Sequence, residues 1–248
     1  MNQFQDIDKL LLDEINQKLR EMYHFEDLDK NTFEEIRKER FKHKNIKILI
    51  LGVGGPGIKI VEDWFNNDPH KEILYGCISY TDYNFEALKI PIKYDLYYPG
   101  KEFGHSRPPK VIFESSYNHY FENAINEAAI RGLLYPSTLK LIIVQSFGGF
   151  SSYLITKWIC KKAIELNVSV TVVGSIPFLW ETIDNREIAM KQICSIEESR
   201  VKVVKLDAEH LFSIYKGDIN FWNCFSFLDK AIEEKVTSIC LEYLNENR

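Results

Sequence analysis

No apolar run in this sequence approaches the roughly 18 residues that a membrane-spanning helix needs. The first residues carry neither a basic leader nor the apolar core of a secretory signal. The five cysteines are odd in number and none belongs to a CxxC pair, and the histidines show no spacing typical of a metal site. These absences favour a cytoplasmic protein with reduced thiols, no membrane partner and no metal bound by cysteine or histidine.

An excess of positive charge is also missing. Lysine and arginine total 31 against 36 aspartates and glutamates, which gives a formal net charge of −5. Because nonspecific contact with phosphate backbones needs basic groups in excess, we expect no nucleic-acid partner. Hydrophobic residues make up 45% of the 248 residues, enough for one α/β domain with a large core.

The first 45 residues differ from the rest because they lack glycine and proline and are heavily charged. Apolar residues recur there at helical spacing: Phe4, Ile7, Leu11, Ile15, Leu19 and Met22. This spacing predicts an amphipathic helix within a helical N-terminal extension, residues 1–45. Its apolar stripe either packs on the main domain, 46–248, or serves as a docking arm for a protein partner.

From residue 46 onward, strand-like and helix-like patterns alternate. Strands are expected near 46–52, 73–79, 139–145, 168–174 and 201–206, with a short one at 92–97 inside a long loop. Helices are expected near 57–66, 110–133, 150–166, 185–199 and 221–244. This alternation predicts an α/β fold with a mainly parallel sheet and helices on both faces.

A glycine-rich segment follows the first expected strand, in the stretch ILILGVGGPG at residues 48–57. Glycines between a strand and a helix let the backbone approach phosphate oxygens, which the helix N-terminus attracts. Gly52, Gly54 and Gly57 fit GxGxxG, a dinucleotide fingerprint, and Asp82 lies near the end of the second strand. A Rossmann-type enzyme that binds NAD or ATP is therefore one interpretation, and tight strand–helix packing alone is another.

A second small-residue loop changes the balance between these interpretations. The strand LKLIIVQS runs into SFGGFSS, which opens another expected helix. Two such loops converging on one ligand suit a nucleoside di- or triphosphate better than a dinucleotide.

Taken in order, these motifs resemble those of the tubulin/FtsZ family over about residues 46–244. GVGGPGIK stands where the family has GVGGxGxN, and SFGGFSSY where it has GGGTGTG. YTD, which contains Thr81 and Asp82, is similar to the family's NTD, and PFLWE to its PFxFE. NFWNCFSFLD looks like the start of its central helix. The resemblance implies a Rossmann-like nucleotide-binding domain of a cytoskeletal GTPase family.

The resemblance also implies a ligand and its contacts. The ligand is a guanine nucleotide, GTP or GDP, and Mg²⁺ can accompany GTP. Glu181 and Arg186 correspond to ribose contacts, and Phe225 and Asp229 to the residues that hold the base. The residues that correspond to phosphate contacts are Gly54, Gly55, Pro56, Gly57, Gly148, Gly149, Phe150, Ser151 and Ser152.

The chain departs from the family at several positions. Phe150 and Tyr153 put bulk into the second loop, Lys59 replaces an asparagine, and Arg186 is shifted by one residue. Lys59 either neutralises phosphate charge or is solvated. Because an aromatic side chain pointing into the phosphate cradle would fill it, the alternative function is a degenerate scaffold that binds proteins and no nucleotide.

The family's second domain has no counterpart in this sequence. In the family its GxxNxDxxD loop positions the attacking water in the next subunit. We therefore expect a binding or regulatory module that does not hydrolyse GTP alone and, if active, needs a partner at a family-like subunit interface. No residue is assigned a catalytic role.

Overall fold

The computed structural model describes residues 48–67, 73–79, 87–95, 140–165, 167–181, 183–214 and 223–246, all within one compact unit of the chain. The N-terminal extension predicted over residues 1–45 and the helix predicted near 110–133 lie outside the described residues. The division into an extension and a main domain therefore stays a prediction.

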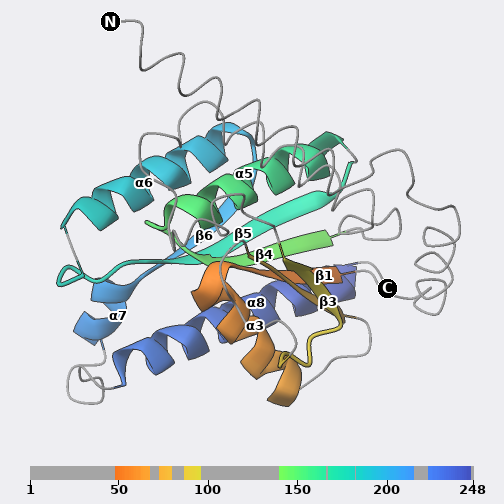
Figure 1. Cartoon of the computed structure of the whole chain (residues 1–248), viewed down its shortest axis with the longest axis horizontal. Helices are drawn as coiled ribbons and strands as arrows, with labels where there is room; N and C mark the ends of the chain where they lie inside the picture. Colours follow the sequence, from red (N-terminus) through yellow and green to blue (C-terminus); the bar gives the residue numbers. More distant parts are fainter. Residues whose placement is uncertain are drawn as a thin grey trace, which may run out of the picture. The chain divides into compact units, whose positions relative to one another are not determined.

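Six parallel strands form one sheet in the order β3-β2-β1-β4-β5-β6 (Figure 1). Their bounds are β1 Ile48–Val53, β2 Ile73–Ser79, β3 Ile92–Asp95, β4 Lys140–Ser146, β5 Ser169–Ile176 and β6 Lys202–Asp207. Strand β1 is buried along its whole length, as its continuous apolar sequence predicts for a parallel strand covered on both faces. The strand order reverses between β1 and β4, which is where open α/β sheets bind ligands.

Helices cover both faces of this sheet, which confirms the predicted fold class (Figure 1). Helices α3, Gly54–Asn67, and α8, Cys224–Glu246, lie together on one face. Helices α5, Phe150–Glu165, and α6, Ile183–Glu198, lie on the other. The short helix α7, Ala208–Ile214, follows β6 and was not predicted from the sequence. None of the described helices is long and apolar enough to cross a membrane.

Helix α8 is a core helix and not a peripheral one. It packs against α3 and against strands β5 and β6. Apolar residues spaced three or four apart form its buried stripe: Leu228, Ile232, Val236, Ile239, Cys240 and Leu244. The long helix that the family resemblance predicts near 221–244 is therefore present, and it crosses the face of the sheet beside α3.

Helix α3 begins directly at the end of β1, so no separate turn joins them. The helix packs so closely that side chains are excluded at two positions. A Cβ on Gly57 would lie 2.2 Å from the carbonyl oxygen of Val144 in β4, and one on Gly52 2.5 Å from the Gly57 carbonyl oxygen. Two glycines of the GxGxxG pattern therefore serve strand–helix packing, the interpretation that the sequence left open.

Replacing Gly57 with alanine is expected to lower the free energy of unfolding by about 2–4 kcal/mol, because the methyl group would overlap Val144 and push α3 off the sheet. Gly55→Ala is the matched control, since no described atom lies within 4 Å of a Cβ there. It should change stability by less than about 1 kcal/mol. Urea unfolding followed by circular dichroism measures both, and equal stability of the two variants would contradict the contact.

Candidate functional site

The two glycine-containing segments meet at the carboxyl edge of the sheet. Strands β1 and β4 are neighbours, so their carboxyl ends lie side by side. A Cβ on Gly54, at the start of α3, would lie 3.2 Å from Cβ of Ser152 in the first turn of α5. The sequence predicts this convergence, and it places two helix N-termini next to each other, an arrangement that attracts anions.

The loop between β4 and α5 is held by Gln192, a buried residue of α6. The Gly148 N–H donates to Oε1 of Gln192 at 2.8 Å, and Nε2 of Gln192 donates to the Gly149 carbonyl at 3.2 Å. The Phe147 N–H donates to the Ser175 carbonyl at 2.9 Å. Because the Gly148 N–H is engaged in this way, a phosphate in the cradle would rest on the first turn of α5. Sequence reasoning missed Gln192, which lies in the middle of a helix and belongs to no motif.

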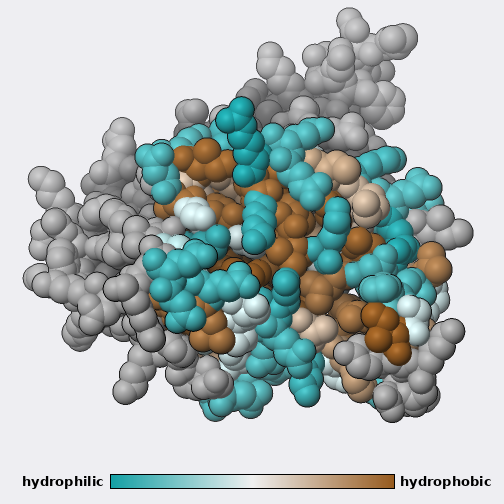
Figure 2. Space-filling view, turned by 180° about the vertical axis from the view of Figure 1, so that it is seen from behind, coloured by the Kyte–Doolittle hydropathy of each residue, from teal (hydrophilic) through white to brown (hydrophobic). Residues whose placement is uncertain are grey.

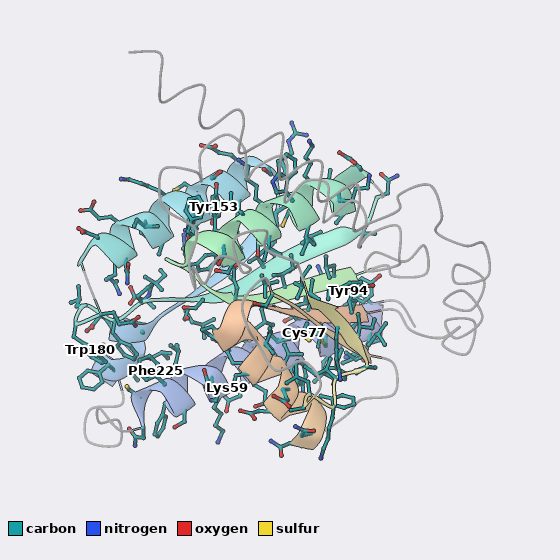
Figure 3. All side chains as sticks on the ribbon, in the orientation of Figure 1. Lys59, Cys77, Tyr94, Tyr153, Trp180 and Phe225 are labelled. Carbon is teal, nitrogen blue, oxygen red and sulfur yellow. The ribbon has the colours of Figure 1, made fainter. Side chains whose placement is uncertain are left out.

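The two aromatic residues of this segment, Phe150 and Tyr153, lie in different surroundings. The Tyr153 hydroxyl donates to Oγ of Ser195 at 2.9 Å, so this side chain extends from α5 toward α6 (Figure 3). Tyr153 therefore does not supply the bulk that was predicted to fill the phosphate cradle. Phe150 is exposed at the start of α5. The Ser152 hydroxyl is turned inward, where it donates to the Gly149 carbonyl at 3.2 Å.

The turn after β5 is closed by two hydrogen bonds between Phe178 and Glu181. Oε1 of Glu181 accepts from the Phe178 N–H at 2.9 Å, while the Glu181 N–H donates back to the Phe178 carbonyl at 3.2 Å. The Leu179 N–H donates to Oε1 of Glu209 in α7 at 2.7 Å. Glu181 itself is exposed. Its predicted contact with a ribose stays a prediction, and the oxygen that closes the turn is already engaged.

Arg186 forms a two-pronged ion pair with Asp207, the last residue of β6. The two guanidinium nitrogens lie 3.0 and 2.7 Å from the two carboxylate oxygens, and one also donates to the Pro177 carbonyl. The hydrogen bond between them raises the pKa of Arg186 and lowers that of Asp207. The ribose contact predicted for Arg186 would have to share this guanidinium. Sequence analysis did not single out Asp207, although its place at the end of a strand was a signal.

Aromatic rings from the turn after β5, from α7 and from the start of α8 contact one another, and Figure 3 labels two of them, Trp180 and Phe225. Trp180 stacks on Phe178 with ring centroids 4.0 Å apart, and Phe225 meets Phe178 edge-on at 5.5 Å. Phe212 meets Trp180 edge-on at 5.8 Å. We call Phe178, Trp180, Phe212 and Phe225 the aromatic cluster. The Phe225 ring is half exposed and can stack on a planar ligand.

Asp229 lies one helical turn after Phe225 in α8. Its Oδ2 accepts from Nζ of Lys59 in α3 at 2.8 Å, and Asp63 lies 3.7 Å from the same nitrogen. The hydrogen bond with Asp229 is the main cause that raises the pKa of Lys59. The structure therefore joins Lys59, which follows the first glycine-rich segment and is labelled in Figure 3, to the carboxylate predicted to hold the base.

Two other predicted contacts, Thr81 and Asp82, lie outside the described residues. Gly55 and Pro56 occupy the first turn of α3, and Ser151 the first turn of α5. Within the described ranges, no group of three or more His, Cys, Asp or Glu side chains could hold a metal ion.

Comparison with known proteins gives matches among solved structures only: no protein-family model and no curated protein matches the chain. An empty FtsZ dimer from M. jannaschii superimposes with a TM-score of 0.61 at 16% identity, over 80% of this chain and 55% of that one. CetZ from Methanosaeta thermophila strain DSM 6194 gives 0.60 at 12% identity, over 79% and 54%. CetZ2 from Haloferax volcanii, a GTPgS-bound protofilament, gives 0.61 at 16%, over 78% and 58%.

At these identities the likeness shows the fold alone, and that fold is FtsZ/tubulin-like. The resemblance read from the motif order is thereby confirmed for the fold. The chain spans a little over half the length of each of these structures.

The Arg186–Asp207 pair should stabilise the protein only where Asp207 is ionised. Because the folded-state pKa of Asp207 is lowered, the contribution is complete above the ordinary aspartate pKa, roughly 3.9, and is lost as pH falls through the lowered value. We expect Arg186→Gln to have a lower free energy of unfolding than the unmodified chain at pH 7. In acid this difference in the free energy of unfolding should disappear.

Urea unfolding at evenly spaced pH values between about 7 and 2.5 measures this difference in the free energy of unfolding. Lys205→Gln, which removes a looser exposed pair with Glu197 at 3.7 Å, is the matched control and should change little. A difference for Arg186→Gln that is as large in acid as at neutral pH would show that the ion pair is not its cause.

Proposed function

We propose that this chain, whose fold is that of the FtsZ/tubulin nucleotide-binding domain, binds a guanine nucleotide at the carboxyl edge of its sheet. The observation that carries the proposal is the position of Phe225 and Asp229 on successive turns of α8, linked through Lys59 to the helix that begins at Gly54. Lys59 lies roughly 7.5 Å along the α3 axis from Gly54. A ribose bridges a span of this order between phosphate and base.

The groups at the proposed phosphate end and at the proposed base end of the site both suit a nucleotide. Phosphates are expected at the adjacent N-termini of α3 and α5, where N–H groups and partial positive charge favour anions. Phe225 offers a ring face for the base to stack on. The Asp229 carboxylate can accept from the N1–H and N2–H groups of guanine, whereas adenine lacks that pair of donors. CetZ2, one of the similar structures, was solved with GTPgS bound.

Binding without turnover is the mode of action that we favour. A carboxylate that positions an attacking water must be oriented toward that water. Four carboxylates on the elements of this edge are instead oriented by a protein group that binds at least one of their oxygens: Glu181, Asp207, Glu209 and Asp229. A binding or regulatory module fits this arrangement. Any partner would act through the helix predicted in the N-terminal extension or through a subunit interface of the family type.

A second candidate, a protein-binding scaffold without nucleotide, is favoured by exposed apolar side chains at this edge. Leu179, Trp180, Ile214 and Phe225 are all more than two-fifths exposed. Seen from behind, apolar side chains reach the surface near α7 and the start of α8 (Figure 2). The scaffold was first suggested by the bulk of Phe150 and Tyr153 in the second loop. The Tyr153 side chain extends toward α6, so it gives this candidate no support.

Calorimetric titration of the purified chain with GDP, GTP, ATP and NAD decides between these functions. We expect guanine nucleotides to bind and ATP and NAD not to. Asp229→Asn should weaken GTP binding roughly tenfold or more, because an amide nitrogen would face the guanine donors. Glu165→Gln, at the end of α5 opposite its first turn, is the control and should bind as the unmodified chain does. NAD binding without guanine binding would favour the Rossmann-type enzyme, and no binding at all would favour the scaffold.

A phosphate-release assay tests the absence of turnover. GTP incubated with the chain over a concentration series should yield phosphate at the rate of the buffer control, since the four carboxylates of this edge are oriented by protein groups. Light scattering recorded in parallel should stay flat. Phosphate release that rises steeply with protein concentration, together with scattering, would contradict this expectation and show that copies of the chain complete a site between them.

A further inference from the structure

Gln192 is a polar residue in the buried stripe of helix α6. Its side chain is only 5% exposed. The other residues of this stripe are apolar and buried: Ala189, Ile193 and Ile196. A buried amide raises the free energy of the folded state unless its donor and its acceptor both find partners. An amide at a position that an apolar side chain could fill therefore indicates a role for its hydrogen bonds.

Both ends of this amide bind the backbone of the loop that joins β4 to α5. Oε1 accepts from the Gly148 N–H at 2.8 Å, and Nε2 donates to the Gly149 carbonyl at 3.2 Å. A backbone N–H can only donate and a carbonyl can only accept, so these partners fix which way the amide is turned. Gln192 thus holds two consecutive residues of the loop from a helix that is not part of the loop.

The backbone conformation of Gly148 depends on its contacts with α6 and with the turn after β5. Its φ of +93° is readily adopted by glycine and rarely by other residues. A Cβ there would lie 3.1 Å from the Asn185 carbonyl oxygen of α6 and 3.2 Å from Cγ of Pro177. Because glycine by itself leaves several backbone conformations open, the bond to Gln192 helps to select this one.

Gly149 links the same amide to helix α5. Its carbonyl accepts from the Tyr153 N–H at 3.3 Å, a bond that closes the first turn of α5, and also from Nε2 of Gln192. The N–H groups at the start of a helix have no carbonyl partner within that helix, and they carry its partial positive charge. A shift of the Gly149 carbonyl would therefore turn the groups that face a bound anion.

We propose that Gln192 is a positioning residue for the phosphate groups of the ligand. It orients the peptide groups of Gly148 and Gly149, and through them it aims the first turn of α5 at the phosphates without touching them. The proposal rests on the proposed function and gives a role to a residue outside both glycine-rich segments. Loss of the amide weakens the part of the affinity that the phosphates supply and spares the part that the base supplies.

The test is the ratio of the affinities for GDP and guanosine, measured by calorimetry on the full chain. We expect the unmodified chain to bind GDP about a hundredfold more tightly, since guanosine has no phosphates. Gln192→Met keeps the length of the side chain without the amide, and should lower the ratio about tenfold by weakening GDP alone. Ser195→Ala is the matched control. It removes the contact of α6 with the Tyr153 hydroxyl and should leave the ratio unchanged.

A second variant, Gln192→Glu, serves if Gln192→Met fails to fold. A protonated carboxyl can donate and accept as the amide does, and burial raises the pKa of a carboxyl. At about pH 5 the ratio for Gln192→Glu should match that of the unmodified chain at the same pH. At about pH 8 the ionised carboxylate would face the Gly149 carbonyl, and the ratio should fall. A ratio that is equally low at both pH values would contradict the proposed role.

Hydrogen exchange of the Gly148 amide, followed by NMR without nucleotide, tests the contact by itself. Exchange should be slow in the unmodified chain and faster in Gln192→Met. Fast exchange in both would overturn the proposal, because the amide would then not hold the loop.

Three results of the titrations would also overturn it. Equal weakening of GDP and guanosine by Gln192→Met would show that Gln192 supports the fold alone. An unchanged ratio would show that the phosphates do not depend on the loop. Loss of the ratio in Ser195→Ala would assign the effect to the packing of α5 on α6 in general. If the unmodified chain binds neither GDP nor guanosine, the proposed function fails and this proposal fails with it, whatever the exchange of Gly148.

Discussion

The close contact of helix α3 with strands β1 and β4 sets the position of everything at the candidate site. At Gly57 the helix backbone touches the Val144 carbonyl with no room for a side chain. This contact fixes both the height of the α3 N-terminus above the sheet and the rotation of the helix about its axis. The rotation in turn aims Lys59 at α8, because α3 and α8 pack side by side on the same face. A wider spacing would separate the lysine from Asp229.

Helix α8 both packs in the core and carries two residues of the candidate site, and the second role depends on the first. Its buried stripe, which includes Leu228 and Ile232, fastens it to the sheet and to α3. The same packing turns Phe225 and Asp229 toward the edge where the glycine segments meet. Since both tasks belong to one rigid helix, a change in core packing would move the site residues as a unit. Sites built on packed helices hold their geometry better than sites built on loops.

Two clamps order the loops around the site. Gln192 holds the backbone after β4, and Arg186 with Asp207 ties the turn after β5 to the end of β6. Both clamps engage polar groups around the candidate site in contacts within the protein. Similar folds with 12–16% identity show why function has to be argued from such residues and not from the fold.

The order of strands, helices and glycine segments was available from the sequence, because apolar runs, helical spacing and strand-end glycines are local patterns. The strands near 73–79 and 139–145 and the helix near 221–244 were predicted within a few residues. The convergence of the two small-residue loops was predicted as well, and the structure brings Gly54 close to Ser152. Local patterns do not contain the partner of a side chain that lies far along the chain. Lys59 meets Asp229 across 170 positions, Gln192 reaches back to Gly148, and Tyr153 turns to Ser195. Each of these pairings depends on which helices share a face and how closely they pack, and the tertiary structure alone decides that.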